Sequence, residues 1–346
     1  MSDDLVLVAD VDREQVRWLW PGRIPLGKLT VIDGDPGTGK STLTLTIAAK
    51  VSTASPFPDG AKPEIGDVIL LSAEDDIGDT IRPRLEAAGA DLARCWVLPD
   101  VHPVDKDGKE EAPRPPELPA DLFLLEDLVK SKAAALVVID PLMAFLAGQV
   151  DSHRDQDVRR VLASMAYMAA RTGAAVLIVR HMNKGTGSAL YRGSGSIGIV
   201  GAARAGLLVA PDPNDDGRRI LASTKENLAP RPEALAYRIV NDELYGVAKV
   251  AWDGASKHTA DELVRPQVDE DSAPALAEAV RILGEILKDG PLAAGNVKKL
   301  AAQAGVAERT LHRARKVLGV TPRRQGFGYG AHYVWTMPAS PPGGLA

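Results

Sequence analysis

The sequence is poor in cysteine and has no apolar run long enough to cross a membrane. Cys95 is its single cysteine, which excludes a disulfide within the chain and a metal cluster held by thiolates. The longest apolar runs, residues 133–139 and 174–179, are far shorter than the ~20 residues of a spanning helix. Residues 1–10 are acidic and lack the basic flank and apolar centre of a signal peptide. We therefore expect a soluble, cytoplasmic protein without a membrane partner.

The sequence also lacks an excess of basic residues, since its net charge is −5. This average hides an uneven distribution of charge along the chain. Residues 274–337 hold ten Lys and Arg against four Asp and Glu, a surplus of +6, which leaves about −11 for the other residues. A basic segment of this kind favours a nucleic-acid partner. The overall charge therefore does not exclude DNA.

Strand and helix patterns alternate along the first 250 residues and predict an α/β fold. Apolar runs typical of strands lie at residues 28–33, 67–72, 135–140 and 174–180, and stretches typical of helices lie at 41–50, 79–88 and 158–171. Buried strands separated by helices indicate a mainly parallel sheet with helices on both faces.

The length of 346 residues favours about two domains. We predict a core domain over residues 1–252, an acidic linker over 253–273, a small basic domain over 274–337 and a disordered tail over 338–346. Within the core, six prolines at residues 98–120 predict an exposed loop, because proline removes backbone donors.

Residues 34–41 read GDPGTGKS, a full match to the phosphate-binding P-loop pattern, between a predicted strand and a predicted helix. Its glycines let backbone amides surround an anion, and the helix N-terminus adds positive potential. We expect Lys40 to reach the β- and γ-phosphates of ATP and Ser41 to hold Mg²⁺. The predicted nucleotide-binding residues are Gly34, Asp35, Pro36, Gly37, Thr38, Gly39, Lys40, Ser41 and Thr42.

Two further apolar runs deliver carboxylates to the same edge of the predicted sheet. Asp140 ends one of them and is the expected second Mg²⁺ ligand, although an acid that opens a turn before a proline is the alternative. Glu74 is the first acid after the other run and has a longer reach than aspartate. We therefore expect Glu74 to orient or deprotonate the attacking water, while Asp75 and Asp76 fit solvated or capping positions equally well.

A polar side chain, His181, follows the run at residues 174–179. At the end of a third neighbouring strand, it would lie close enough to contact the γ-phosphate and to sense its loss. A histidine that bonds locally at the end of its strand is the alternative.

The motifs occur in a specific order along the chain: WPGRIPLGK at residues 20–28, the P-loop, SAED at 72–75, IDPL at 139–142, HMNK at 181–184 and RGS at 192–194. This order resembles the RecA-fold ATPases of the plasmid RepA replicative helicase type. The resemblance covers roughly residues 15–250. It implies a ring-shaped hexamer with ATP between subunits and single-stranded DNA in the pore.

The resemblance also implies roles for single residues. It makes Glu74 the water-activating glutamate, Asp140 the Walker B aspartate and His181 the polar sensor. Cations offered to the neighbouring subunit would be Arg204 as the arginine finger, Arg192 as the runner-up and Lys225 as a second cation, although Arg192 and Lys225 fit plain surface positions as well. The loops at residues 145–157 and 182–198 are expected to face DNA, the second through Lys184 and Arg192.

Residues 297–319 fit a helix-turn-helix, and residues 321–335 fit a hairpin after it, so that together they predict a winged helix. The expected DNA contacts are Arg309, His312, Arg313 and Lys316 on the second helix, and Arg323 and Arg324 in the hairpin. Duplex DNA binding and docking to a protein both remain open for this domain.

The sequence thus predicts an ATP-hydrolysing, DNA-associated motor of the RepA-like helicase type. One alternative is a recombination or repair ATPase similar to RecA and RadA, which forms filaments. A second alternative is an ATP-switched DNA-binding regulator without helicase activity.

Overall fold

The computed structural model describes residues 6–103, 109–146, 155–182, 197–264, 272–325 and 332–338. The chain divides into two compact units, Met1–Arg265 and Pro266–Ala346. None of the helices within these described ranges is long and apolar enough to cross a membrane.

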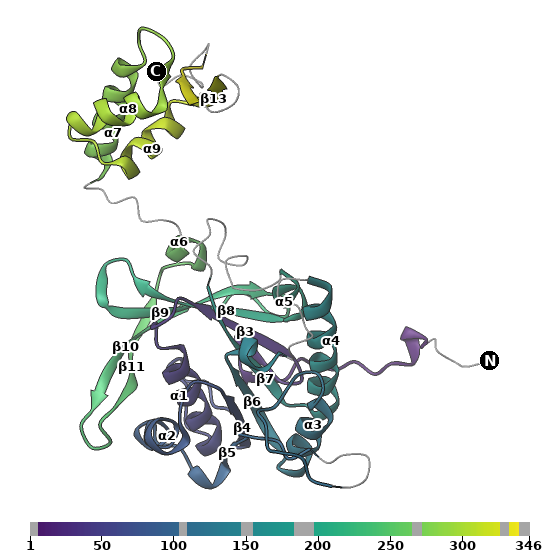
Figure 1. The fold of residues 1–346 in the computed structure, drawn as a ribbon. Helices are drawn as coiled ribbons and strands as arrows, with labels where there is room; N and C mark the ends of the chain where they lie inside the picture. The colour runs from purple at the N-terminus through teal and green to yellow at the C-terminus, as the bar shows by residue number, and fades with distance from the viewer. Residues whose placement is uncertain are drawn as a thin grey trace. The chain divides into compact units, whose positions relative to one another are not determined.

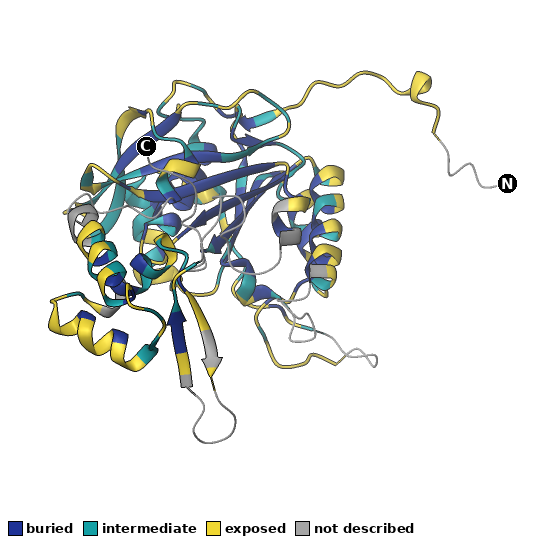
Figure 2. Cartoon of the chain, turned by 90° about the horizontal axis from the view of Figure 1, so that it is seen from above, coloured by how far each residue is buried: buried dark blue, intermediate teal, exposed yellow. Residues whose placement is uncertain are grey.

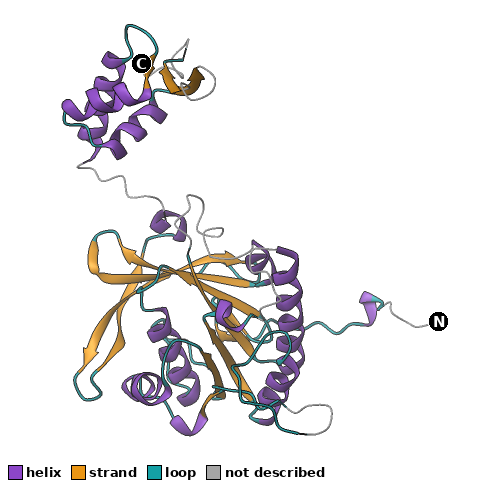
Figure 3. Ribbon diagram, viewed as in Figure 1, coloured by secondary structure: helices purple, strands orange, loops and turns teal. Residues whose placement is uncertain are grey.

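A nine-stranded sheet forms the centre of the first unit, in the order β11-β10-β9-β8-β3-β7-β6-β4-β5 (Figures 1 and 3). The parallel strands are β3 (Leu29–Gly34), β4 (Asp67–Ser72), β5 (Cys95–Val97), β6 (Ala134–Asp140), β7 (Ala175–His181) and β8 (Ala205–Asp212). The antiparallel strands are β9 (Asp215–Glu226), β10 (Ala234–Asp242) and β11 (Val247–Ser256). The predicted α/β fold with a mainly parallel sheet is therefore confirmed.

Helices cover both faces of this sheet (Figure 1). One face carries α1 (Lys40–Thr53) and α2 (Arg82–Ala87), and the other carries α3 (Leu122–Ser131), α4 (Asp155–Thr172) and the short α5 (Ile197–Ala202). Alternate residues of a strand point to opposite faces, so Ile32 packs in the α1 layer while Val31 packs in the α4 layer. Figure 2 shows the resulting pattern, with buried strands and helices exposed along their outer sides.

Smaller elements complete the first unit. Strands β1 (Trp18–Trp20) and β2 (Ile24–Pro25) form an antiparallel pair. The described residues of the proline-rich segment, 98–103 and 109–120, contain no helix and no strand beyond isolated bridges such as Val101 with Arg114.

The segment predicted as an acidic linker, residues 253–273, differs from expectation in its first half. Asp253 lies in β11, where its carboxylate pairs with Arg218 at 3.0 Å and with Arg238 at 3.4 Å. Helix α6 (Ala260–Val264) then packs on β8 and β9 through two buried apolar side chains. The acids at the start of this segment are thus ion-pair partners and helix residues of the first unit.

The described residues of the second unit form three helices and a small antiparallel sheet. The helices are α7 (Ser272–Ile286), α8 (Ala294–Gln303) and α9 (Glu308–Val317), and the strands are β12 (Leu292–Ala293), β13 (Thr321–Gln325) and β14 (His332–Thr336), in the order β12-β14-β13. Leu283, Val297, Leu311 and Trp335 are buried together in its core. Gly305, between α8 and α9, has φ +81°, a conformation that favours glycine.

Candidate nucleotide-binding and catalytic site

The P-loop connects the end of β3 to the first turn of α1. All three of its glycines are required by space or conformation, Gly37 through its φ of +76°. A Cβ on Gly34 would lie 2.5 Å from the carbonyl oxygen of Val209, and a Cβ on Gly39 would lie 2.9 Å from Ile239. Gly39 also has φ +84°, where other residues are strained. The loop therefore holds its backbone close to neighbouring strands, as an anion cradle at a helix N-terminus requires.

Lys40 lies inside this loop and is 4% exposed. Its Nζ donates to the carbonyl oxygens of Gly34 and Asp35, both at 2.9 Å, and lies 3.3 Å from Nδ1 of His181. Burial lowers the pKa of Lys40, and the nearby carboxylates, Asp140 first among them, oppose that change. The ammonium is therefore held by the loop's own backbone at the place where phosphates would bind.

Ser41 and Asp140 lie beside each other at the carboxyl edge of the sheet, where both line one small cavity. Burial raises the pKa of Asp140 to about 6, and the charges of Asp75 and Glu74 add to this effect. No group of three His, Cys, Asp or Glu side chains gathers into a metal site within the described residues. One hydroxyl and one carboxylate suit Mg²⁺, which usually completes its octahedral shell with substrate phosphates and water. The residues present therefore fit a nucleotide-bound Mg²⁺.

The three acids after β4 have different surroundings. Asp75 pairs with Arg84 at 2.9 Å. Asp76 accepts the backbone N–H groups of Gly78 and Asp79 at 2.7 and 3.2 Å, and so caps a π-helical turn, Ile77–Ile81, that begins the predicted helix 79–88. These bonds keep both aspartates in structural positions. Glu74, whose side chain is 64% exposed, remains available at this strand end.

His181 lies between the lysine and the glutamate. The pairing of β3 with β7 places it opposite Gly34. One ring nitrogen is 3.3 Å from Lys40 Nζ, and the other is 3.9 Å from Glu74 Oε1. Lys40, Ser41, Glu74, Asp140 and His181 thus gather at one edge of the sheet, although four separate segments supply them. Their catalytic roles stay predictions.

A buried ion pair beneath the P-loop was missed by the sequence analysis. Asp33 accepts hydrogen bonds from Nε and Nη2 of Arg180 at 2.7 and 2.9 Å, and both side chains are at most 3% exposed. Asp33 directly precedes Gly34, and Arg180 directly precedes His181. The sequence feature that could have predicted this pair is a charged residue near the end of each of two apolar strands. Buried charges are rarely left unpaired, so an acid and a base on two buried strands are expected to pair.

The predicted trans-acting cations lie at the other edge of the sheet. The Arg204 backbone N–H donates to the carbonyl of Leu29 at 2.9 Å, which is the first residue of the six-residue strand that leads to the P-loop. At ~3.3 Å per residue that strand separates the two edges by about 20 Å. Lys225 Nζ donates to the carbonyl of Ala203 at 2.7 Å. Arg192 and Lys184 lie outside the described residues.

The basic residues of the second unit are only partly described. In α9, Lys316 is exposed, while His312 and Arg313 are half-buried. The side chains of Arg309, Arg323 and Arg324 lie outside the description, although their backbones belong to α9 and β13. An aromatic contact was not anticipated: Trp335 has the Arg315 guanidinium 5.2 Å from its ring centroid and the His312 ring at 5.9 Å.

The chain is similar to known proteins over its first half. Residues 3–187 match the family model described as "AAA domain". DNA repair protein RadA of Halalkalibacterium halodurans is 24% identical over 177 residues, which are 51% of this chain and 32% of that protein. DNA repair protein RadA of Streptococcus pneumoniae is 26% identical over 168 residues, 49% of this chain and 33% of that protein.

The chain thus spans about a third of the length of the curated relatives it matches. The narrower resemblance to RepA-type helicases stays a prediction. The family match covers more than half of the chain and includes the P-loop, Glu74, Asp140 and His181. The chain therefore belongs to the AAA domain family and has a RecA-like P-loop ATPase core.

Proposed function

We propose that this chain hydrolyses ATP at the P-loop edge of its sheet and couples hydrolysis to action on DNA. The observation that carries the proposal is that His181 lies 3.3 Å from Lys40 and 3.9 Å from Glu74, beside the cavity that Ser41 and Asp140 line. In this proposal each of these groups takes a role that phosphoryl transfer requires.

The residues divide the work as follows. The loop amides and Lys40 bind the phosphates. Glu74 accepts a hydrogen bond from the attacking water and orients it, since it is the acid at this strand end that no described backbone group or arginine holds in a structural contact. His181, placed between Glu74 and Lys40, is positioned to respond to the terminal phosphate. Bound Mg²⁺, held by Ser41 and Asp140, would neutralise phosphate charge.

Completion of the site requires a second subunit in this proposal. Arg204 is separated from its own P-loop by the length of β3, about 20 Å, and therefore serves as an arginine finger only for a neighbouring copy. Lys225 holds the carbonyl of Ala203, directly before Arg204, and so positions this finger. Homo-oligomerisation follows from such a shared site, and the resemblance to RepA-type helicases favours a hexamer.

DNA is the proposed partner for two reasons. The relatives that match the core are named DNA repair proteins. The second unit combines a helix pair, a small sheet and a basic segment, which together support a winged helix that binds duplex DNA. A RepA-like helicase is the favoured form of the motor, and the RadA similarity makes a recombination or repair ATPase the second candidate.

The test compares ATPase and strand-displacement activities of the wild type with those of Lys40→Ala and Glu74→Gln. Glu74→Gln should retain nucleotide binding and lose about 10²- to 10⁴-fold in hydrolysis rate, the usual contribution of a general base. Asp76→Asn is the matched control, because Asp76 only caps a turn, and it should hydrolyse ATP at nearly the normal rate. Normal hydrolysis by Lys40→Ala would refute the site.

A mixing experiment tests the shared site. Arg204→Ala and Lys40→Ala copies should each be inactive alone and should regain activity when mixed, because a finger from one copy then meets a P-loop from the other. Arg231→Ala, which removes an exposed arginine paired with Glu226, is the control. ATP hydrolysis without strand displacement on either polarity would favour the repair ATPase or a regulator.

A further inference from the structure

The buried ion pair between Asp33 and Arg180 joins the two strands that lead to the P-loop and to His181. Asp33 lies one residue before the end of β3, Arg180 lies one residue before the end of β7, and the two stand directly opposite each other in the parallel register. Two hydrogen bonds of 2.7 and 2.9 Å connect the guanidinium to the carboxylate. A bidentate pair of this kind fixes both the separation and the orientation of its two groups. The pair therefore fixes how the ends of β3 and β7 lie relative to each other.

The end of β7 is held from one side. Its pairing with β6 ends at Ile178, opposite Ile139, so the last three residues of β7 extend past the ladder on that side. On the other side, the pairing with β3 continues as far as His181, opposite Gly34. The Met182 N–H then donates to the Gly34 carbonyl at 3.1 Å. Among the strands that the structure describes, β3 alone pairs with the end that carries His181.

The pair lies on the opposite face of the sheet from the His181 side chain, because neighbouring residues of a strand point to opposite faces. Val31 and Ile178 pack in the α4 layer. Asp33 and Arg180 lie two positions later on the same strands and therefore face that layer too. Both side chains are at most 3% exposed. They do not line the predicted phosphate site, and they act on it only through the residues beside them.

Packing alone does not hold the His181 ring, because its side chain is 35% exposed. One ring nitrogen lies 3.3 Å from Lys40 Nζ, and the other lies 3.9 Å from Glu74 Oε1. Both distances change if the end of β7 shifts along β3 or away from it. A displacement of about 1 Å at a reacting group can cost about 10²-fold in rate. The geometry of the site thus depends on the strand end that the buried pair fixes.

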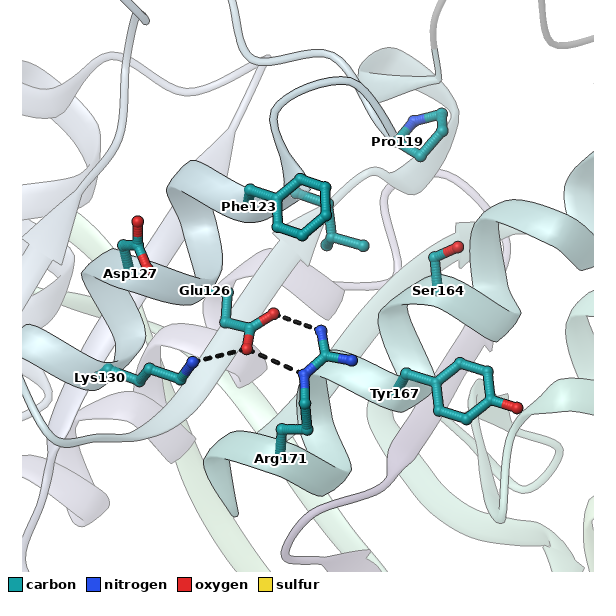
Figure 4. A pocket seen from close by; sticks show the side chains of 9 residues that line it. Pro119, Phe123, Glu126, Asp127, Lys130, Ser164, Tyr167 and Arg171 are labelled. Carbon is teal, nitrogen blue, oxygen red and sulfur yellow. Dashed lines mark hydrogen bonds and ion pairs between the residues drawn. The ribbon is translucent and has the colours of Figure 1, made fainter. Parts of the chain in front are cut away.

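Stability alone does not require this pair, because apolar side chains of similar volume often replace a buried ion pair without loss of stability. Another bidentate pair of the first unit offers a contrast. Glu126 of α3 bonds Arg171 of α4 in a groove on the outer surface (Figure 4). The Arg171 side chain is 52% exposed, and neither residue adjoins a residue of the nucleotide site in sequence. In the buried pair, by contrast, each member directly precedes a residue of that site.

We propose that Asp33 and Arg180 are positioning residues, which hold His181 in contact with Lys40 and Glu74 and so permit hydrolysis of the terminal phosphate. The inference rests on the proposed function and deepens it, because it assigns a part in hydrolysis to residues outside the phosphate site. Neither residue touches the nucleotide. Nucleotide binding is therefore independent of the pair, and the hydrolysis step depends on it.

The double variant Asp33→Val/Arg180→Met separates positioning from stability, because it removes both charges together and leaves neither unpaired. Its affinity for ADP, which lacks the terminal phosphate, should equal that of the wild type in a titration with a fluorescent analogue. Its kcat for ATP should fall about 10- to 100-fold. An unchanged kcat would overturn the proposal, and so would a loss of ADP affinity as large as the loss of kcat.

Glu126→Leu/Arg171→Met is the matched control. It replaces the other bidentate pair in the same way, on helices that carry no residue of the nucleotide site. Its kcat should equal that of the wild type at the same assembly state, checked by native mass. An equal fall of kcat in both double variants would overturn the proposal, because it would show a general effect of lost ion pairs.

A cycle of substitutions tests whether the pair acts through His181. His181→Ala alone, and His181→Ala combined with Asp33→Val/Arg180→Met, should have the same kcat, because a ring that is absent cannot be misplaced. A combined loss equal to the product of the two separate losses would overturn the proposal, because it would mean that the pair and the ring act independently.

NMR of the nucleotide-free protein tests the position of the ring without hydrolysis. The His181 ring signal, assigned by its loss in His181→Gln, should shift on Lys40→Met in the wild type, because Lys40 Nζ lies 3.3 Å from Nδ1. The same substitution should shift the signal much less in the Asp33→Val/Arg180→Met background. Equal shifts would overturn the proposal, whether or not the chain hydrolyses ATP. A failure of the proposed function is reported separately, by the ATPase rate of Lys40→Ala.

Discussion

The buried ion pair between Asp33 and Arg180 leads to a quantitative prediction. The two side chains share hydrogen bonds of 2.7 and 2.9 Å and are 3% and 1% exposed, so solvent does not screen them. Asp33→Val or Arg180→Met leaves the partner as an unpaired buried charge. Each single substitution should therefore lower the free energy of unfolding of the first unit by about 3–5 kcal/mol. The double substitution removes both charges and should cost less than either single one.

Urea unfolding followed by tryptophan fluorescence measures this effect. Four of the five tryptophans lie in the first unit, and a Trp335→Phe background removes the signal of the second unit. Arg17→Met is the control, because it breaks an exposed pair with Glu64, whose side chains are 69% and 82% exposed, and should cost less than about 1 kcal/mol. A double variant whose loss equals the sum of the two single losses would refute the reasoning.

The remaining predictions concern the nucleotide site and the basic residues of helix α9. Burial raises the pKa of Asp140 from 3.8 to about 6, so the carboxylate binds its proton more tightly in the native chain than in the unfolded chain. The ligand-free chain should therefore lose up to about 3 kcal/mol of its free energy of unfolding as the pH rises from 4 to beyond 6. Asp140→Asn should remove this loss and raise the melting temperature at pH 7.5 without Mg²⁺, and equal melting curves would contradict it. Gly39→Ala should weaken nucleotide binding at least ~10-fold in a fluorescence titration, because Gly39 has φ +84° and the added Cβ would lie 2.9 Å from Ile239. Unchanged affinity would show that the loop adapts. Lys316→Glu should weaken duplex DNA binding and reduce its salt dependence. Lys288→Glu is the control, because the Lys288 side chain is 71% exposed and lies outside α9, and it should leave binding unchanged. Equal effects of the two substitutions would indicate nonspecific charge attraction.

The fold was predictable because the strands of a parallel sheet are continuous apolar runs. The run at residues 67–72 coincides with β4, and the run at 135–140 differs from β6 by a single residue. The P-loop was equally predictable, because its glycines and lysine occupy fixed spacings that depend on local backbone geometry. For the same reason, the sequence predicted which strand ends carry Asp140, Glu74 and His181.

The linker was less predictable, because composition does not show pairing. The acids near residue 253 suggested exposure, yet Asp253 has arginine partners on two strands that lie 35 and 15 positions earlier in the chain. Ion pairs between residues so far apart in sequence depend on strand order, which the sequence pattern did not give.

The sequence by itself determined the strand and helix pattern, the phosphate-binding loop and the set of polar residues at the strand ends, since each depends on neighbouring residues. Tertiary structure alone decided that Asp75 and Asp76 are held in structural contacts while no described arginine or backbone group holds Glu74, that Asp33 and Arg180 neutralise each other, and that Arg204 lies at the opposite edge from the P-loop. The physical reason is that the environment of a charge depends on which groups the folded chain places beside it, and those groups come from strands and helices distant in sequence.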